Sequence, residues 1–246
     1  MTGRTRTSSP ERRPRADGAR TRERILERAG ELFAATSFAE TTGKAIAVAA
    51  DVDLASINYH FGSRTGLYQA VLVEAHRRLI TLDLLERLEG SDAPARAKFQ
   101  QLIEALVDGA LARRGWHSRV LARELLAPSS NLKALVQYEA LPKIRVIAQL
   151  ISAMTGIPVD DPAIPRCLLN VAAPCLMLFV APADVPGPLQ TVLRMPRAAL
   201  VAHLQRFALA GLQAIARDHS RVPPRRPEPS RGVRLKPPQR KPTARK

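Results

Sequence analysis

Apolar residues recur at helical spacing through the first third of the chain and predict four helices in quick succession. The first spans residues 19–36, where apolar side chains one turn apart form a single stripe. The second follows a cap at Thr41 or Thr42, and the third follows Asp53, because these side chains accept hydrogen bonds from the free N–H groups that open a helix. The fourth is a long helix at residues 63–88 that begins on a Ser cap. Short helices joined by a tight turn and followed by a longer helix are the helix-turn-helix pattern.

The third predicted helix has a narrow apolar face and compact hydrogen-bonding side chains opposite it. Its apolar stripe consists of Leu54, Ile57 and Phe61, which should face the other helices. Ser and Asn side chains can bond base edges, and Tyr, His and Arg side chains can bond phosphates. Residue types alone favour an ordinary amphipathic surface helix over a DNA-reading one. The outward-facing positions are Ala55, Ser56, Asn58, Tyr59 and His60.

The remaining two-thirds of the chain predicts further helices, and the fold class is therefore all-α. Leu, Ala and Arg dominate the composition and aromatic residues make up only 4%, which favours helices over strands. Pro142 lies inside one predicted helix and should kink it. A loop is expected at residues 156–165. The predicted helical segments are 95–114, 116–127, 131–155, 167–182 and 196–217.

Two of these segments are unusually apolar. Segment 167–182 has Asn170 as its only polar side chain and contains two prolines. A bilayer span needs about 20 residues, so a helix buried on both sides is favoured over a membrane span. Segment 196–217 has a broad apolar face with small residues that suit close helix packing.

Two such apolar faces are more than one small domain has to bury within itself. We therefore expect a two-fold homodimer whose interface contains both segments. The alternative is that both helices belong to the chain's own core. The expected interface residues on the second segment are Leu200, Leu204, Phe207, Ala208, Gly211, Leu212 and Ile215.

The net charge of +16 is concentrated at the two ends of the chain. Residues 1–22 carry a net +5 and residues 218–246 carry a net +8. Stretches so rich in Pro, Arg and Ser cannot bury enough surface to fold, so we expect disordered basic tails at 1–18 and 218–246. The tails are either simply solvated, or they add sequence-independent attraction to a polyanion.

The sequence offers little chemistry outside binding. Cys167 and Cys175 are too few for a disulfide scaffold and their spacing matches no zinc ligand set, so we expect reduced buried thiols and no metal or cofactor. No HExxH, GxSxG, P-loop or GxGxxG motif is present, which argues against an enzyme. The Arg-rich N-terminus lacks the apolar stretch of a secretory signal, so a cytoplasmic protein is expected. A helical adaptor that binds acidic proteins through its tails stays open.

Residues 20–75 resemble the DNA-binding domain of TetR-family transcriptional repressors. The stretch DLASINYHFGSRTGLYQAVL and the later LARELLAPS resemble the subgroup whose C-terminal domain is shared with the repressor CecR. The stretches that match the family are IL-RA-ELF at Ile25–Phe33, TT--AIA--A-V at Thr41–Val52, INYHF at Ile57–Phe61 and SR--LY at Ser63–Tyr68.

This resemblance implies a helix-turn-helix domain at 19–66, running into the linker helix, and a helical effector-binding and dimerisation domain at 67–217. It implies a homodimer that binds a palindromic double-stranded DNA operator, without contact to a membrane, and is released by a small lipophilic effector. By resemblance Thr42 and Lys44 would meet phosphate, Ser56 and Asn58 would lie nearest the base edges, and Ala55 would allow close approach. Tyr59 and His60 would brace the DNA backbone, and Arg64 would meet phosphate at the start of the fourth helix.

Two positions depart from the family pattern. Ser37 and Asp51 stand where the family usually has Gly, at turns that favour a positive φ. Asp tolerates that conformation fairly well and Ser tolerates it less.

The effector pocket is expected among the helices of the C-terminal part. Polar or aromatic side chains on otherwise apolar helices are the candidates for ligand contact, although for each of them an interhelical hydrogen bond or a core-filling role is the simpler and favoured explanation. These candidates are Trp116, Arg123, Glu124, Tyr138, Asn170 and Met177.

Overall fold

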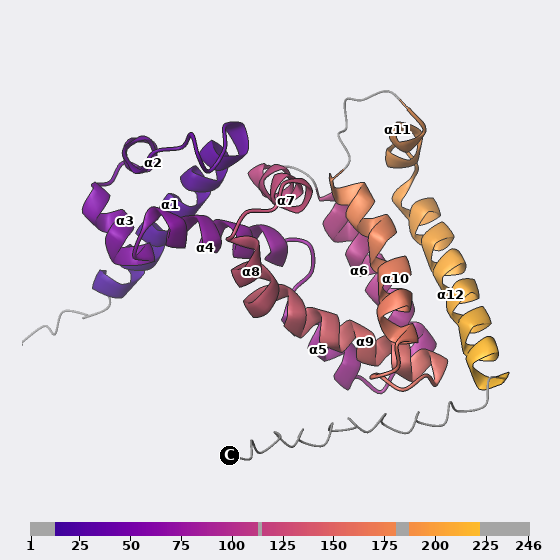
Figure 1. Cartoon of the computed structure of the whole chain (residues 1–246). Coiled ribbons are helices and arrows are strands. Elements are labelled where there is room, and N and C mark those ends of the chain that lie inside the picture. Colours follow the sequence, from indigo (N-terminus) through magenta and orange to yellow (C-terminus); the bar gives the residue numbers. More distant parts are fainter. Residues whose placement is uncertain (1–12, 113–114, 181–186, 222–246) are drawn as a thin grey trace, which may run out of the picture.

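The computed structural model of the chain describes residues 13–112, 115–180 and 187–221, and all the regular elements in these ranges are helical (Figure 1). The predicted all-α fold is therefore confirmed. The N-terminal part comprises α1 (Arg13–Ala35), α2 (Gly43–Ala49), α3 (Leu54–Phe61) and α4 (Arg64–Arg77). The C-terminal part comprises α5 (Leu82–Gly90), α6 (Ala95–Leu111), α7 (Trp116–Leu126), α8 (Leu132–Leu135), the π-helical η1 (Val136–Ala140), α9 (Leu141–Thr155), α10 (Ala163–Val180), α11 (Pro188–Leu193) and α12 (Arg197–Arg221).

Side-chain caps begin three of the four N-terminal helices, as the sequence predicts. The Oγ1 atom of Thr42 accepts a hydrogen bond from the backbone N–H of Ala45 at 3.1 Å. Asp53 accepts from the N–H of Ser56 at 2.7 Å, and Ser63 accepts from the N–H three residues on at 3.0 Å. Each cap satisfies a donor that the first turn of a helix leaves free, which fixes where α2, α3 and α4 begin.

The predicted long helix at 63–88 is wrong, because the chain breaks it into α4 and α5. Thr81 provides a new cap by accepting from the N–H of Leu84 at 3.2 Å. α6 approaches the turn between the two helices so closely that a Cβ on Gly109 would overlap the carbonyl oxygen of Leu79. The sequence pattern does not show this close approach, because both halves carry apolar stripes of similar spacing.

Several other boundaries differ from the prediction. α1 begins at Arg13 rather than at Ala19, and α12 continues to Arg221, so both helices extend into the stretches predicted as tails. The rest of those tails, residues 1–12 and 222–246, lies outside the described residues. Ser37 does not adopt the positive φ expected for it, since Asp51 at φ 50° is the non-glycine residue with positive φ in the described part.

The helical segment predicted to kink at Pro142 has a π-helical stretch directly before α9, the helix that contains this proline. The N–H of Leu141 bonds the carbonyl of Val136, five residues earlier. Pro142 has no N–H to donate, so the regular ladder cannot continue through it. π-helical turns of this kind occur frequently at functional sites.

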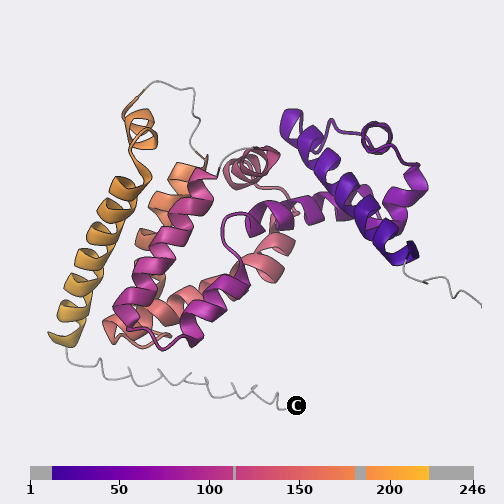
Figure 2. The same cartoon turned by 180° about the vertical axis from the view of Figure 1, so that it is seen from behind.

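α7 joins the two parts of the molecule. It packs against α1 and α4 on one side and against α10 on the other, and Figures 1 and 2 show it between the N-terminal helices and the C-terminal bundle. Its buried residues continue a single apolar core from one part into the other. A displacement of α7 would therefore be felt in both parts.

α10 is not buried on both sides, which corrects the prediction for segment 167–182. Its inner face includes Cys167 and Cys175, which are free thiols as expected, and burial raises the pKa of Cys175 to about 11. Its outer face leaves Leu169 65% exposed. α10 and α12 are both long and apolar enough to cross a bilayer by length and composition alone. The last two residues of the predicted segment lie outside the described part.

Candidate nucleic-acid interface and regulatory core

α3 presents its polar face to solvent. Ile57 is 1% exposed and anchors the helix, whereas Tyr59 is 85% exposed. Ala55 and Asn58 are also exposed. Phe61 is half-buried, but Leu54 is 45% exposed, so the predicted inward stripe is wrong for Leu54. The helix therefore turns Ile57 inward and offers small and hydrogen-bonding side chains outward, the side-chain types that can contact base edges.

The remaining polar residues of α3, Ser56 and His60, make contacts with other side chains of the protein. Ser56 is half-buried, and hydrogen bonds from its hydroxyl and its backbone N–H hold the pKa of Asp53 below its usual range. The Ser56 hydroxyl donates to this cap and keeps its lone pairs for accepting a hydrogen bond from a base. His60 is half-buried and lies edge-on to the ring of Tyr59, with 5.0 Å between ring centroids.

α2 contributes an exposed edge beside α3. Thr42, the helix cap, and Lys44 are both exposed. Val48, one turn after Lys44, is 83% exposed. Sequence reasoning missed Val48, although its position outside the inward stripe of Ile46 and Ala47 was a usable signal.

The turn between α2 and α3 is held from α1. Asp51 adopts its positive φ in this turn, and Arg24 donates to its carbonyl oxygen from Nη2 at 3.3 Å. The N–H of Val52 bonds the carbonyl of Ala47 at 3.0 Å. These bonds fix the angle at which α3 leaves α2.

Arg64, predicted to meet a phosphate, is engaged within the protein at the start of α4. Its Nη1 atom donates to the carbonyl oxygens of Phe38 and Thr41, each at 2.6 Å. Its guanidinium also lies 4.2 Å from the centroid of the Phe38 ring. Arg64 therefore ties the α1–α2 connection to the start of α4, and the planar fork of Arg suits this double contact.

α7 contacts the N-terminal part of the chain through two consecutive side chains. Arg123 donates from Nη1 to the carbonyl oxygen of Phe33 at 2.9 Å and to that of Thr36, at the C-terminus of α1. Glu124, 2% exposed, accepts from the hydroxyl of Tyr68 on α4 at 2.9 Å. Both residues thus connect helices, as the simpler interpretation of their sequence positions held.

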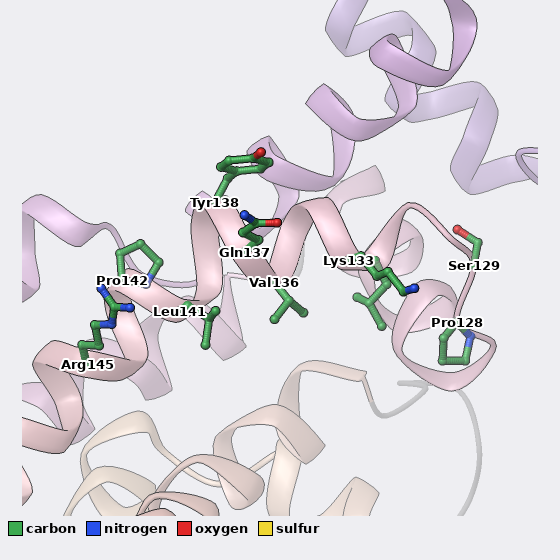
Figure 3. Close-up of a pocket in the computed structure, with 10 residues that line it drawn as sticks. Pro128, Ser129, Lys133, Val136, Gln137, Tyr138, Leu141, Pro142 and Arg145 are labelled. Atoms are coloured by element: carbon green, nitrogen blue, oxygen red, sulfur yellow. The ribbon is translucent and has the colours of Figure 1, made fainter. Parts of the chain in front are cut away.

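The other predicted effector residues lie apart from one another. Trp116 is buried against Gly30 of α1, where a Cβ would overlap its ring. Asn170 and Met177 are exposed on α10. Tyr138 is 72% exposed and lines an open groove of about 960 Å³ along α8, η1 and α9, from which its side chain projects in Figure 3. The six predicted residues do not form one site.

A partly open apolar cavity of about 260 Å³ lies instead among α4, α6, α7, α8, η1, α9 and α10, and it shares Leu132 and Val136 with the groove of Figure 3. None of the six predicted effector residues lines it. A usable signal was nevertheless present, because Lys143 shares a helical stripe with Val146, Ile147 and Leu150 and is 2% exposed. A charged residue at an inward position marks a site that apolar packing alone does not explain. The residues around the cavity include His76, Leu79, Leu106, Leu121, Leu125, Leu135, Lys143, Ile147, Cys175 and Leu176.

Lys143 has two polar neighbours, of which His76 also lines the cavity. Its ammonium lies 2.5 Å from Oε1 of Glu139 on η1 and 3.1 Å from Nδ1 of His76 on α4. Burial lowers the pKa of Lys143, and the Glu139 carboxylate opposes that shift. Burial and the nearby Lys143 charge lower the pKa of His76 to about 4, so its imidazole is neutral at pH 7.

The predicted dimer face on α12 divides into two sets. Phe207 is 68% exposed and Gly211 is also exposed. The other residues pack within the chain, and the prediction is wrong for Leu200 and Leu212, which are only 2% and 3% exposed. The inward set is Leu200, Leu204, Ala208, Leu212 and Ile215.

Family models match both parts of the chain. The model of bacterial regulatory proteins of the tetR family matches residues 25–71. The model of the C-terminal domain of the HTH-type transcriptional dual regulator CecR matches residues 95–214. No curated protein matches the chain.

Solved structures share the fold over most of their length. FadR, the fatty acid degradation regulator from Bacillus halodurans, has a TM-score of 0.60 at 14% identity and covers 77% of this chain and 98% of its own. NalD, the secondary repressor of the MexAB-OprM multidrug efflux pump in Pseudomonas aeruginosa, has 0.58 at 21% identity over 79% and 98%. A TetR-family regulator from Mesorhizobium loti has 0.58 at 16% identity over 80% and 97%. At these identities the likeness shows the fold alone.

A helix-turn-helix domain joined to an all-helical C-terminal domain defines a class of transcription regulators that are not enzymes. The chain belongs to the TetR family of transcriptional regulators and carries a C-terminal domain of the CecR type.

Proposed function

We propose that the protein is a ligand-responsive repressor that binds a palindromic operator as a homodimer and leaves it when a small effector binds. The observation that carries this proposal is the two-sidedness of α3, where Ile57 is buried while Asn58 and Tyr59 face solvent. The exposed edge of α2, with Lys44, continues the same polar surface. A short helix with such a face fits the major groove of a DNA duplex.

Each exposed residue has a proposed role at the groove. Asn58 reads a base edge, and Ser56 accepts from one through its remaining lone pairs. Ala55 lets the helix approach closely. Contacts to the DNA backbone fix the register, and their proposed donors are Thr42, Lys44, Tyr59 and His60.

The proposed dimer uses the outer faces of α10 and α12, which lie side by side at the edge of the bundle (Figure 1). Leu169 and Met177 of α10 are 65% and 53% exposed, and Phe207 of α12 is 68% exposed. Large apolar side chains left exposed on two neighbouring helices are typical of a protein interface. A two-fold axis through it gives each operator half-site one copy of α3.

Release from the operator is proposed to be a population shift. α7 and α4 connect the cavity to the DNA-binding part, through Arg123 to α1 and through Tyr68 to Glu124. A ligand that fits one arrangement of these helices better than another changes the spacing of the two α3 helices. At saturating ligand, the operator affinity then falls by a fixed factor. This factor is the ratio of the ligand's affinity for the DNA-free protein to its affinity for the operator-bound protein.

Selection from random duplexes with the full-length protein tests this function. The proposal predicts enrichment of a palindrome whose half-sites lie about one helical turn apart, and a log affinity that falls linearly with log salt concentration. Binding that depends on salt but enriches no sequence would contradict a repressor and favour the helical adaptor with basic tails.

A further inference from the structure

The apolar cavity has one charged group in its wall, the ammonium of Lys143. An ammonium has three N–H donors. Within the described part of the chain its polar partners are Glu139 at 2.5 Å and His76 at 3.1 Å. Since the Lys143 side chain is only 3% exposed, water does little to screen this charge. The Lys143 charge is paired with the Glu139 carboxylate, and of this ion pair only Lys143 lines the cavity. The cavity is therefore an apolar space that exposes the positive partner of a buried ion pair at one point of its wall.

His76 reinforces this polarity. Its imidazole is neutral at pH 7, so Nδ1 accepts a hydrogen bond from the Lys143 ammonium rather than competing with it for an anion. His76 also contributes to the cavity wall. A cationic ligand would meet the Lys143 charge without gaining a free anion in the wall. A ligand with a carboxylate or an equivalent acidic group would gain a charge-assisted hydrogen bond.

Glu139 is the group that such a ligand must replace. Its carboxylate is also 3.6 Å from Nε of Arg77 and 4.0 Å from Nδ1 of His76, and both of these residues lie at the C-terminal end of α4. Glu139 thus holds the π-helical η1 against the helix that leads to the DNA-binding part. A ligand anion on Lys143 takes over one of its contacts and weakens that hold.

We propose that the cavity binds a small amphipathic anion, with an apolar body among the leucines and an acidic group on Lys143 in competition with Glu139. This specifies the effector class of the regulator, and its effect on DNA rests on the proposed repressor function. The site itself does not depend on DNA binding. Loosening of η1 from α4 is the link between ligand and operator.

A series of ligands with one chain and different head groups tests the site directly. Octanoate, 1-octanol and octylamine are titrated into the full-length protein at pH 7 by isothermal calorimetry. The proposal predicts that octanoate binds at least about tenfold more tightly than 1-octanol, since a hydrogen bond to a charged group is the stronger one, and that octylamine binds least. Shortening the acid to hexanoate should weaken binding by about fourfold for each methylene removed. Equal affinity for acid and alcohol would overturn the proposal.

Two matched variants test whether the Lys143 charge causes the preference for the acid. Lys143→Met should bind octanoate and 1-octanol alike, whereas Lys143→Arg should keep the preference for the acid. Lys133→Met removes an exposed lysine from the groove of Figure 3 and should change nothing. If Lys133→Met instead loses octanoate, the ligand occupies the open groove and the cavity proposal fails. The wild-type series decides the case even if Lys143→Met does not fold.

Glu139→Gln tests the link to DNA. Without the competing carboxylate, octanoate should bind several-fold more tightly, and operator affinity without ligand should fall. Unchanged octanoate affinity in Glu139→Gln would contradict the competition. If no operator exists, the head-group preference should still be present, so failure of the repressor function and failure of the cavity proposal give different results.

Discussion

Tyr68 on α4 donates a hydrogen bond from its hydroxyl to the buried carboxylate of Glu124 on α7, with 2.9 Å between the two oxygens. Burial and the adjacent carboxylate raise the pKa of Tyr68 above its usual range, so it remains a donor at any physiological pH. Ser129 also stabilises the Glu124 carboxylate, since its hydroxyl and its backbone N–H both donate to it. The contact joins the helix that leads to the DNA-binding part to the helix that borders the cavity.

Tyr68→Phe should lower the free energy of unfolding by about 1.5–3 kcal/mol, because the buried carboxylate loses one of its donors. Urea denaturation followed by circular dichroism measures the change. Tyr138→Phe is the matched control, because Tyr138 is 72% exposed and should stay within about 0.5 kcal/mol of the wild type. Equal stability of the two variants would mean that the Tyr68–Glu124 bond contributes nothing.

Gly30→Ala should destabilise the junction between α1 and α7. The added Cβ would overlap the ring of Trp116, and forcing extra atoms into such a contact costs about 1–3 kcal/mol. Gly18→Ala on the same helix meets nothing within 4 Å and should instead gain up to about 1 kcal/mol from its better helix propensity. Thermal unfolding should therefore separate the two variants in opposite directions. A stabilising Gly30→Ala would show that Trp116 can move away freely.

The local features of the DNA-binding part were readable from the sequence. The caps Thr42, Asp53 and Ser63 accept hydrogen bonds from residues three positions away. Thr, Asp and Ser are preferred cap residues, so the sequence alone predicts them. The burial of Ile57 follows from its place in a helical stripe. The family resemblance then supplied the meaning of the exposed face, which residue types alone did not.

The contacts between distant residues were not readable. Arg64 bonds carbonyls 23 and 26 residues earlier in the chain, and a backbone carbonyl leaves no trace in the sequence. Lys143 meets His76 across 67 residues, and no local sequence pattern connects two residues so far apart in the chain. The break between α4 and α5 depends likewise on the approach of Gly109 to Leu79.

The stability of the protein should fall as the pH drops from about 6.5 to about 4. In this window the unfolded His76 binds a proton, while the folded His76, with its pKa of about 4, does not. The free energy of unfolding therefore decreases toward acid, by up to about 3 kcal/mol at the lower end. His76→Gln should show a shallower decrease in urea titrations at pH 7, 6, 5 and 4.

The difference between wild type and His76→Gln isolates the imidazole. Hydrogen bonds lower the pKa of Asp53 and of Asp161, so both carboxylates also remove stability in acid, but they do so equally in the two proteins. Parallel curves for the two proteins would contradict the depressed pKa of His76.

Phe207→Glu should convert the proposed dimer to a monomer without unfolding the chain. Phe207 is 68% exposed, so a charge there costs the single chain little but would be desolvated at the proposed interface. Sedimentation equilibrium measures the mass of each protein. Leu200→Ala serves as the contrast, since Leu200 is 2% exposed and its loss should reduce stability by about 2–5 kcal/mol through a cavity in the chain's own core. A wild-type monomer at all concentrations, or a dimeric Phe207→Glu, would place the interface elsewhere.

Tyr59→Ala separates affinity from specificity on α3. Tyr59 is 85% exposed and is proposed to contact the DNA backbone. Its removal should weaken binding to the selected operator and to its single-base variants by the same factor, because phosphate contacts carry no sequence information. Fluorescence anisotropy at fixed salt concentration provides the affinities. A loss confined to one base pair would assign Tyr59 to base reading instead.

The same titration with Asn58→Ala tests most directly whether the outward face of α3 reads DNA. Operator affinity is measured for the wild type and the variant against every single-base change of the palindrome. The account predicts that the variant loses about 1–3 kcal/mol of discrimination at one symmetric pair of positions and keeps the wild-type preference elsewhere. Equal losses on every duplex, or no loss on any, would contradict it.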